Sequence, residues 1–338
     1  MFNFFKKFMP APDLKPFLGA LLDERQPAEK QDDVHFSDIV ATANPVNWIT
    51  KASYRTFPVL DQNQSYTCGA NALSKAEGVS FAQKYGSYLQ LSRADIYQRR
   101  MNRPQAGMTL YDMFDIASQG VTLEQFVSSK LYNDSDYDSA VIESWMKDVA
   151  KTFSINGGVY LENDIDTIAS VIQTTGKGVI LLTYFLSSEW SRQVPVITNR
   201  LLGRNDPSSL RHFVVAVDFT LINGVKYLVI EDSAHFGGLA QRLVSEDWVK
   251  NRVAGAGYPM NFKFVPGTGN KPTYNGATIV SAQECLKFEG VFPQNVATIE
   301  NVGPTTRKAL AAFQNKYGLP VTQAIDVATR NKLHQLYP

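Results

Sequence analysis

The sequence predicts an α+β domain followed by a small all-helical unit. Between residues 44 and 264, apolar side chains recur at helical spacing in the first half, whereas short apolar runs typical of strands fill the second half. Helices and strands segregated in this way are typical of α+β domains and not of alternating βαβ units. A stretch rich in Gly, Pro and Asn at residues 265–276 has the composition of a flexible linker, and it separates off residues 277–338.

The composition limits the function classes that the chain can belong to. Its 338 residues suit one large domain or two ordinary ones, and 44% hydrophobic with 19% charged residues is ordinary globular usage, not that of disordered or fibrous proteins. A formal net charge of +1 gives no overall attraction to nucleic acid or anionic membranes. No apolar run approaches the ~20 residues that span a bilayer. We therefore expect neither a nucleic-acid partner nor a transmembrane segment.

Residues 1–43 form an N-terminal extension, a possible prosegment or anchor. Lys6 and Lys7 lie between aromatic residues, and the apolar stretch at 17–22 is shorter than the ~7–15-residue core of a secretion signal. We therefore expect a short amphipathic segment that packs on the main domain (residues 44–264), and not a cleaved signal peptide. Residues 23–43 are polar and charged, and we interpret them as a linker or extension.

Two helices are predicted in the first half of the main domain. Small and apolar residues follow Cys68 at helical spacing, and a second amphipathic stretch runs over residues 111–117. Three apolar runs then predict strands at 178–184, 212–218 and 226–230. The last two runs flank an Asn-Gly pair, which is the strongest short signal for a β-hairpin.

The last unit, the C-terminal module (residues 277–338), has its own helix signals. Gly303 and Pro304 open a helix, because Pro is favoured at the first helical position, and Gly318 with Pro320 ends it. Asp326 is the expected N-cap of a final helix. The apolar stripe of the first of these helices consists of Leu310, Phe313 and Tyr317.

The chain has two cysteines, Cys68 and Cys285, so that no disulfide framework stabilises the fold and the cellular compartment stays open. Cys68 follows a polar loop and begins a predicted helix, where the helix dipole and unpaired N–H groups stabilise a thiolate. Cys285 lies on the apolar face of a helix, and we expect it to be a core residue.

The loop before Cys68 resembles the papain family of cysteine peptidases. Asp61 and Gln62 are followed by Cys68 six residues after the glutamine, which is the family's spacing. The resemblance implies that Cys68 is the nucleophile, and that the Gln62 amide and the Cys68 backbone N–H hold the developing oxyanion. It also implies a two-lobed domain with a cleft between the helical and β halves.

Further landmarks follow in the family's order. A Leu-Ser pair at 91–92 stands where these enzymes open a helix, and 120–124 is similar to their Gly-Ile-x-x-Glu stretch. Ala106 and Gly107 occupy the place of the paired glycines whose backbone binds substrate as an added strand. The resemblance therefore implies that these two residues bind substrate.

His212 lies 144 residues after Cys68, inside the ~130–150-residue interval expected for the general base. Asp232 follows 20 residues later, where the family usually has Asn. Either a carboxylate or an amide can orient an imidazole. The resemblance therefore implies a catalytic set of Cys68, His212, Asp232 and Gln62.

The sequence also departs from the family. The extra cysteine and the aromatic residue around the nucleophile are absent, and Ala234 replaces the Trp that shields the His–Asn pair. A lone Cys or His is usually a packed core residue. His235 is a weaker candidate base because it lies in a Gly-rich loop, and Glu231 alternates to the other face of its strand from Asp232.

The C-terminal module resembles the peptidoglycan-binding three-helix module. Its first helix ends in a Leu-x-x-x-Gly pattern at 286–290, Gly-Pro-x-Thr opens the second at 303–306, and Phe-Gln at 313–314 precedes Gly-Leu-Pro. Asp326 begins the closing Asp-x-x-Thr pattern. The resemblance implies a peptidoglycan ligand, although such modules also serve as scaffold domains.

The resemblances together predict a papain-like cysteine endopeptidase without metal or cofactor, acting on a protein or peptide and targeted to a cell wall or surface by residues 277–338. Two alternatives stay open: a hydrolase of peptidoglycan stem peptides, and a catalytically vestigial structural or virion-associated protein. We expect an extracellular, cell-envelope or virion-associated location by a non-classical route.

Overall fold

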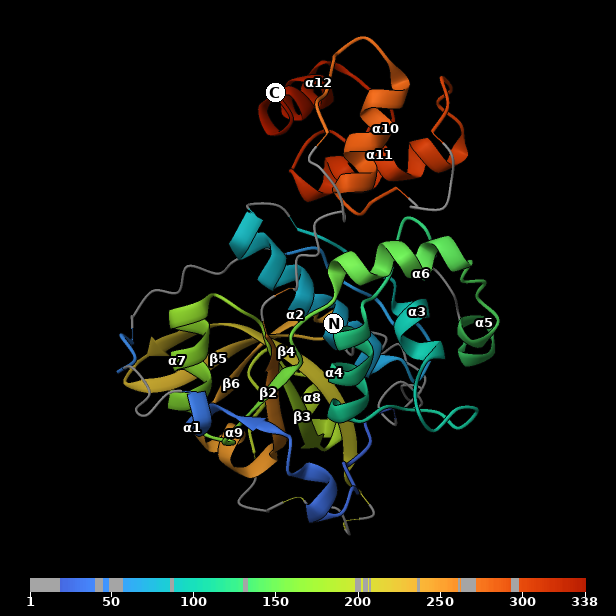
Figure 1. Cartoon of the computed structure of the whole chain (residues 1–338). Helices are drawn as coiled ribbons and strands as arrows, with labels where there is room; N and C mark the ends of the chain where they lie inside the picture. Colours follow the sequence, from blue (N-terminus) through green and yellow to red (C-terminus); the bar gives the residue numbers. More distant parts are fainter. Residues whose placement is uncertain are drawn as a thin grey trace, which may run out of the picture.

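The computed structural model describes most of the chain, and Figure 1 shows its arrangement. The expected amphipathic segment falls almost entirely outside the described residues, as does most of the expected linker. The described residues are 19–39, 45–48, 57–85, 88–129, 133–197, 202, 206, 208–235, 238–260, 262, 272–292 and 298–338.

The main domain has a helical half and a β half, as predicted. Local signals explain where its helices begin. The side chains of Ser92 and Thr109 accept hydrogen bonds from the backbone N–H of the third residue of the helix that follows each of them. At Thr109 the cap is a capping box, because the Asp112 carboxylate also accepts from the Thr109 N–H. The helices of this half are α2 (Cys68–Tyr85), α3 (Arg93–Gln98), α4 (Leu110–Gln119), α5 (Asp134–Asp138), α6 (Ser144–Ala150) and the 3-10 turn η3 (Lys151–Phe153).

The β half is a mostly antiparallel sheet. Its described strands follow the order β1-β2-β7-β3-β4-β5-β6, and only the short β1 pairs in parallel, with β2. The strands are β1 (Val34–His35), β2 (Gly158–Leu161), β3 (Val179–Phe185), β4 (Leu210–Ile222), β5 (Val225–Glu231), β6 (Gln241–Ser245) and β7 (Val253–Pro259).

The predicted hairpin is confirmed as the β4–β5 pair. Asn223 and Gly224 both have positive φ, at 51° and 78°, which two-residue hairpin turns require and these residues tolerate. The register set by this turn ends β5 at Glu231 and leaves Asp232 beyond the strand, beside the residues of β4.

The sheet is buried on both faces. Ile180 and Leu182 of β3 belong to the apolar cluster that contains α2, while Val179 and Leu181 belong to the cluster on the opposite face. Apolar side chains of three helices pack on that opposite face, and the sequence patterns did not indicate these helices. They are α7 (Ile165–Thr175), α8 (Ser187–Trp190) and α9 (Glu246–Arg252). The sheet is therefore a rigid platform on which α2 rests.

An N-terminal strap, residues 19–35, lies along the main domain. Arg25 contacts the main domain, because its guanidinium stacks 3.6 Å from the ring centre of Tyr111 on α4. Its ion pairs with Asp23 and Asp33, at 2.7 Å each, hold the strap itself in its folded shape. The strap contains the 3-10 turn η2 (Pro27–Lys30) and β1, and it leads into α1 (Phe36–Ile39). The charged residues that the sequence suggested as a linker thus make specific contacts.

The C-terminal module is a three-helix unit of α10 (Ile279–Phe288), α11 (Pro304–Lys316) and α12 (Val327–Leu336). Asp326 caps α12 by accepting from the Thr329 N–H, as predicted. Cys285 is fully buried, in agreement with its predicted core role, and burial together with Glu289 and Glu284 raises its pKa to about 12.

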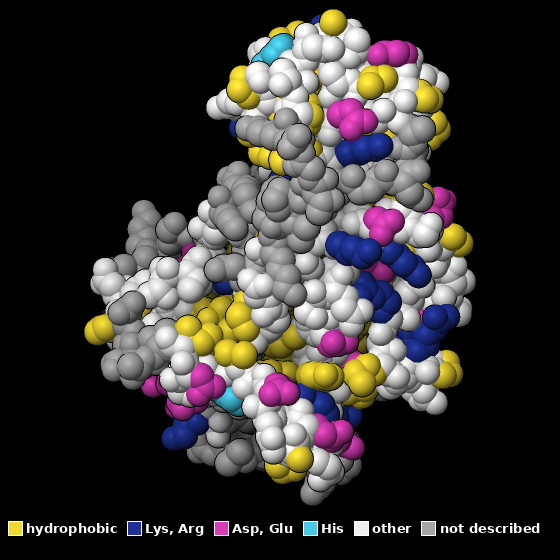
Figure 2. Space-filling model, in the orientation of Figure 1, with side chains coloured by type: hydrophobic (Ala, Val, Ile, Leu, Met, Phe, Trp, Pro, Cys, Tyr) yellow, Lys and Arg dark blue, Asp and Glu magenta, His cyan; other side chains and the backbone are white. Residues whose placement is uncertain are grey.

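The module packs against the main domain, because its buried apolar residues continue the cluster that contains α2, and polar side chains also join the two. The Thr152 hydroxyl donates to the Gly290 carbonyl at 2.9 Å, and Asn315 donates to Gln125 at 2.8 Å. In Figure 1 the module lies beyond α6, and Figure 2 shows Lys and Arg side chains gathered beneath it. A hollow between α3 and α6 is lined by four cations, Arg99, Arg103, Lys147 and Lys151.

Candidate active site

Cys68 is the first residue of α2, and its side chain is buried. The loop that delivers it is held from both sides. The Tyr66 N–H donates to Asp134 at 2.9 Å, and the Asn71 side chain donates to the Thr67 carbonyl at 2.9 Å. The predicted position of Cys68 at a helix N-terminus is therefore found, with its thiol at the end where backbone N–H groups and the helix dipole favour an anion.

His212 approaches Cys68 from the sheet. It is the third residue of β4 and fully buried, and its Nε2 lies 2.7 Å from Oδ1 of Asp232. Burial alone lowers the pKa of His212, but the charge and hydrogen bond of Asp232, with the Cys68 thiol, outweigh it and raise the pKa to about 9. Since Nε2 is engaged by Asp232, Nδ1 is the ring nitrogen that remains for the thiol.

Asp232 receives four hydrogen bonds. Oδ1 accepts from His212 and from the Ala234 N–H at 2.8 Å, while Oδ2 accepts from the indole of Trp190 at 2.8 Å and from Arg242 at 2.7 Å. Burial favours the neutral acid, but His212, Arg242 and the Ala234 N–H more than compensate and lower the pKa of Asp232 to about 2. Asp232 is therefore a fixed, ionised partner for His212.

Gln62 is brought to the same place by the loop after β5. Its backbone N–H donates to the Ser233 carbonyl at 3.0 Å, and its side-chain Oε1 accepts from the Ser233 hydroxyl at 2.7 Å. Its Nε2 donates to the Ser65 carbonyl at 3.0 Å. Ser233 thus fixes the amide so that its nitrogen end lies toward the loop before Cys68, as an oxyanion donor requires.

In the segment predicted to bind substrate, the residue that pairs with another strand is Met108, next to Ala106 and Gly107, whose substrate role stays a prediction. The Gly107 N–H donates to the Tyr97 hydroxyl at 3.2 Å, so the neighbouring Met108 presents the strand-pairing groups. Met108 pairs with the N-terminal strap: its N–H donates to the Gly19 carbonyl at 2.9 Å, and its carbonyl accepts from the Leu21 N–H at 2.8 Å. Ala106 makes no such pairing, and its carbonyl accepts from Asn102.

The strap comes very close to the nucleophile. A Cβ placed on Gly19 would lie 2.1 Å from the Tyr66 carbonyl oxygen and 3.0 Å from Sγ of Cys68, so only glycine fits there. Together with the pairing to Met108, this puts residues 19–21 beside both the nucleophile and the segment in which substrate binding is predicted.

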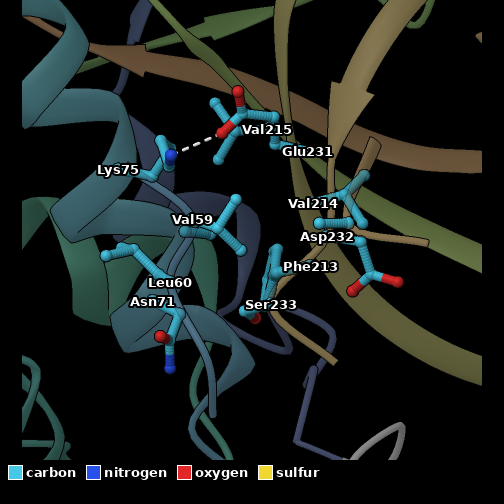
Figure 3. A pocket seen from close by; sticks show the side chains of 12 residues that line it. Val59, Leu60, Asn71, Lys75, Phe213, Val214, Val215, Glu231, Asp232 and Ser233 are labelled. Carbon is cyan, nitrogen blue, oxygen red and sulfur yellow. Dashed lines mark ion pairs between the residues drawn. The ribbon is translucent and has the colours of Figure 1, made fainter. Parts of the chain in front are cut away.

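The competing residues are engaged elsewhere. The His235 Nε2 bonds the Leu60 carbonyl at 2.9 Å, away from the thiol. Figure 3 shows Glu231 turned toward Lys75 of α2, with which it forms an ion pair, while Asp232 points the other way. Behind them, between α2 and the sheet, lies a cavity of about 20 Å³, enough for about one water molecule.

Trp190 and Arg242 both bond Asp232, and the sequence patterns did not mark either residue. The Trp190 ring of α8 stands edge-on to His212, with centroids 6.4 Å apart, so an aromatic side chain lies beside His212 although Ala234 replaces the Trp of the family. Arg242 comes from β6. No local pattern marks either residue, because both reach Asp232 only through the packing of separate elements.

Two negative findings complete the description of the site. Among the described residues, no three His, Cys, Asp or Glu side chains are grouped so as to hold a metal ion. In the same part of the chain, no helix combines the length and apolar character needed to cross a membrane.

Comparison with solved structures identifies the fold of the main domain. Xylellain, a cysteine protease from Xylella fastidiosa, matches with a TM-score of 0.53 at 16% identity, covering 74% of this chain and 97% of its own. The procathepsin B S9 from Trypanosoma congolense matches with a TM-score of 0.52 at 12% identity, covering 74% and 88%. Digestive procathepsin L 3 of Tenebrio molitor larval midgut gives 0.50 at 16% identity, covering 65% and 76%. The predicted papain-like α+β fold is confirmed.

Sequence comparison identifies the C-terminal module. Residues 275–333 match the family model described as "Putative peptidoglycan binding domain", which confirms the predicted resemblance and starts two residues before the expected boundary. No curated protein matches the chain in sequence.

Proposed function

We propose that this chain, whose main domain has the papain-like cysteine protease fold, is a cysteine endopeptidase. The observation that carries the proposal is the buried array of Cys68, His212 and Asp232, with His212 bonded to Asp232 at 2.7 Å and in contact with the thiol. A thiol at a helix N-terminus next to a raised-pKa imidazole is the arrangement that generates a nucleophilic thiolate. The low identity of the structural relatives supports the fold alone, so the activity rests on this geometry.

The reaction proceeds in two halves. Cys68 gives its proton to His212, and the thiolate attacks the peptide carbonyl carbon to form a C–S bond. His212 then donates that proton to the leaving amine as the C–N bond breaks, which leaves an acyl-enzyme. In the second half His212 takes a proton from water, the hydroxide attacks the thioester, and Cys68 is released. Asp232 keeps the imidazole oriented throughout.

The Gln62 amide and the Cys68 backbone N–H are proposed to stabilise the oxyanion of both tetrahedral intermediates. Support for Gln62 comes from the bond between its Oε1 and the Ser233 hydroxyl, which fixes which end of the amide faces the nucleophile loop. Preorganised donors of this kind need no rearrangement when charge develops.

We further propose that the full-length chain is a latent form, with residues 1–43 acting as a prosegment. The strap supports this, since Gly19 and Leu21 occupy the pairing groups of Met108 and Gly19 lies against Cys68. A peptide substrate that binds as an added strand needs the same pairing groups. The strap must therefore leave before substrate can bind.

The C-terminal module is proposed to attach the enzyme to peptidoglycan, and thus to a cell wall. Its match over residues 275–333 supports this ligand. The module contacts the main domain on the α6 side, and its described residues make none of the bonds found at the Cys68 site, so we propose that its role is attachment and not chemistry.

Labelling with an epoxide-type thiol inhibitor tests the proposed activity. We expect covalent labelling of Cys68, mapped by peptide mass analysis, once the strap is loosened by Arg25→Ala. Cys68→Ala should remove the label and Cys285→Ser should keep it. Labelling that persists in Cys68→Ala would refute the assignment of the nucleophile.

A second substrate class is favoured by one observation, the peptidoglycan-binding match of the module. The enzyme would then cleave the stem peptides of the wall to which it binds. Digestion of purified peptidoglycan and of a denatured protein in parallel separates the two, with new amino groups as the readout. We expect cleavage of the protein, whereas release of stem-peptide fragments alone would favour the wall hydrolase.

A further inference from the structure

Asp232 has a second cationic partner besides His212. Arg242 projects from β6 and is completely buried, and its Nη1 lies 2.7 Å from Oδ2 of Asp232. Its Nε donates to the Trp190 carbonyl at 3.0 Å, and its guanidinium lies 4.7 Å from the centre of the Trp190 ring. Burying a guanidinium costs several kcal/mol unless an anion compensates. Arg242 is therefore committed to Asp232.

Each oxygen of Asp232 accepts two hydrogen bonds, and this arrangement prevents rotation of the carboxylate. Oδ1 takes His212 and the Ala234 N–H, while Oδ2 takes Trp190 and Arg242. Turning the carboxylate would break the charge-assisted bond to Arg242, which is among the stronger hydrogen bonds in proteins. The direction from Oδ1 to His212 is thus fixed by groups on the far side of Asp232.

The charges around His212 come from three elements. Cys68 faces it from α2, Asp232 from the end of β5, and Arg242 from β6 through Asp232. Other charged side chains nearby are paired away from it: Glu231 with Lys75, and Glu189 of α8 with Arg252 of α9 at 2.7 Å. In the ion-pair form of the site, the thiolate and carboxylate are balanced by the imidazolium and guanidinium.

We propose that Arg242 is a positioning residue: its buried guanidinium fixes the carboxylate of Asp232, offsets part of its negative charge, and so limits how tightly Asp232 holds the proton of His212. A proton held too tightly is passed slowly to the leaving amine, because general acids work best when their pKa is near the working pH. Arg242 thus acts on the reaction through Asp232, without touching substrate. The kinetic consequence rests on the proposed peptidase function, but the effect on His212 does not.

Histidine titration by NMR tests this directly, since the chain has only four histidines. In histidine-labelled full-length protein, His212→Gln identifies the His212 signal. Arg242→Gln keeps a hydrogen-bond donor but removes the charge, and it should raise the pKa of His212 by on the order of one unit. In Arg242→Lys, which keeps the positive charge, the pKa of His212 should stay close to its wild-type value. Arg252→Gln, a matched buried arginine paired with Glu189, should leave the pKa unchanged.

An Arg242→Gln protein whose His212 titrates as in wild type would overturn the proposal, as would an equal shift in Arg252→Gln. If Arg242→Gln does not fold, the double variant Asp232→Asn/Arg242→Gln tests the pairing of Arg242 with Asp232 instead, because it removes both buried charges together. It should unfold at a higher temperature than Asp232→Asn alone, and its His212 pKa should fall below that of wild type. A double variant that unfolds at the same temperature as Asp232→Asn alone, or at a lower one, would contradict the pairing of Arg242 with Asp232.

Peptidase assays add a second readout that is separate from the first. Arg242→Gln should lower kcat with little change in KM. It should also move the alkaline limb of the pH–rate profile to higher pH, by the same shift that NMR measures for the pKa of His212. If a chain whose strap has been loosened by Arg25→Ala still lacks peptidase activity, the proposed function is refuted, yet the NMR titration would still decide the role of Arg242.

Discussion

The two cysteines have the same chemistry and opposite surroundings. Cys68 lies at a helix N-terminus beside His212, whereas Cys285 is enclosed in the module core, where burial and two glutamates raise its pKa to about 12. We expect Cys68→Ala to abolish hydrolysis without unfolding the protein, and Cys285→Ser to keep most activity. Turnover in Cys68→Ala above ~1% of wild type, measured on a purified sample, would contradict this, because loss of a nucleophile costs orders of magnitude.

If Gln62 stabilises the oxyanion, substitutions at Gln62 and at Ser233 should lower kcat to different extents. Gln62→Ala should lower kcat by ~10²–10³ with little change in KM, as removal of one oxyanion donor does. Ser233→Ala should have a smaller effect in the same direction, because it removes only the hydroxyl that orients the amide. Steady-state kinetics on a soluble peptide measures both, and an unchanged kcat in Gln62→Ala would show that the spacing to Cys68 is coincidental.

Glu77 makes a prediction about stability. Burial raises its pKa well above the usual value, and neither carboxylate oxygen has a hydrogen-bond partner among the described residues. A carboxyl with a raised folded-state pKa contributes its stability below the unfolded value of 4.5 and loses it as pH rises. Glu77→Gln should therefore match wild type near pH 4 and be more stable by at least about 1 kcal/mol at pH 8. Urea unfolding at both pH values measures this, and an equal gain at both would contradict it.

At the residue scale, the sequence revealed those site residues that have a fixed spacing or a helix end to mark them. Cys68, Gln62, His212 and Asp232 were predicted in this way, and the structure brings them together, although their catalytic roles stay predictions. Trp190 lies 42 residues from Asp232 and Arg242 lies 10 residues from it. Their contacts depend on how separate elements pack, which residue spacing does not encode.

Among the elements, the strap has the clearest consequence for access to the site. Arg25→Ala removes the stack on Tyr111 and also the two ion pairs that hold the strap in its folded shape, so the strap should detach more often and alkylation of Cys68 by iodoacetamide should speed up several-fold. The rate of label incorporation at Cys68, followed by mass spectrometry, measures this. Arg103→Ala, an exposed arginine outside the strap, serves as the control and should react like wild type. Equal rates in all three proteins would show that the strap does not limit access.

Elements with local signals were predicted well, and elements that depend on distant partners were not. The β4–β5 hairpin and the Asp326-capped helix follow from turn and capping chemistry, whereas the helix opened at Ser92 was expected from the family resemblance. β1 has two residues and pairs with β2, more than 120 positions along the chain, so nothing in its own sequence marks it as a strand. Residues 23–35 of the strap were expected to be part of a linker or extension for the same reason.

For the whole molecule, the question is whether attachment and catalysis separate. A protein ending near residue 264 should keep turnover on a small soluble peptide, provided the strap is loosened equally in both proteins, and it should lose co-sedimentation with insoluble peptidoglycan. The assay should be run at high salt, because the cations around the α3–α6 hollow attract anionic polymers at low salt. A folded but inactive truncated protein would show that the module helps to build the cleft.

The strap and the cleft belong to one chain, and this has a consequence for kinetics. A segment tethered beside its own binding site competes at an effective concentration that can reach the millimolar range, and this value does not change when the protein is diluted. A soluble peptide would have to exceed that concentration to displace residues 19–21. Activation would therefore depend on whether the strap is still covalently joined to the main domain. A single cut after the strap lets the segment diffuse away, and its competition with substrate then falls with dilution.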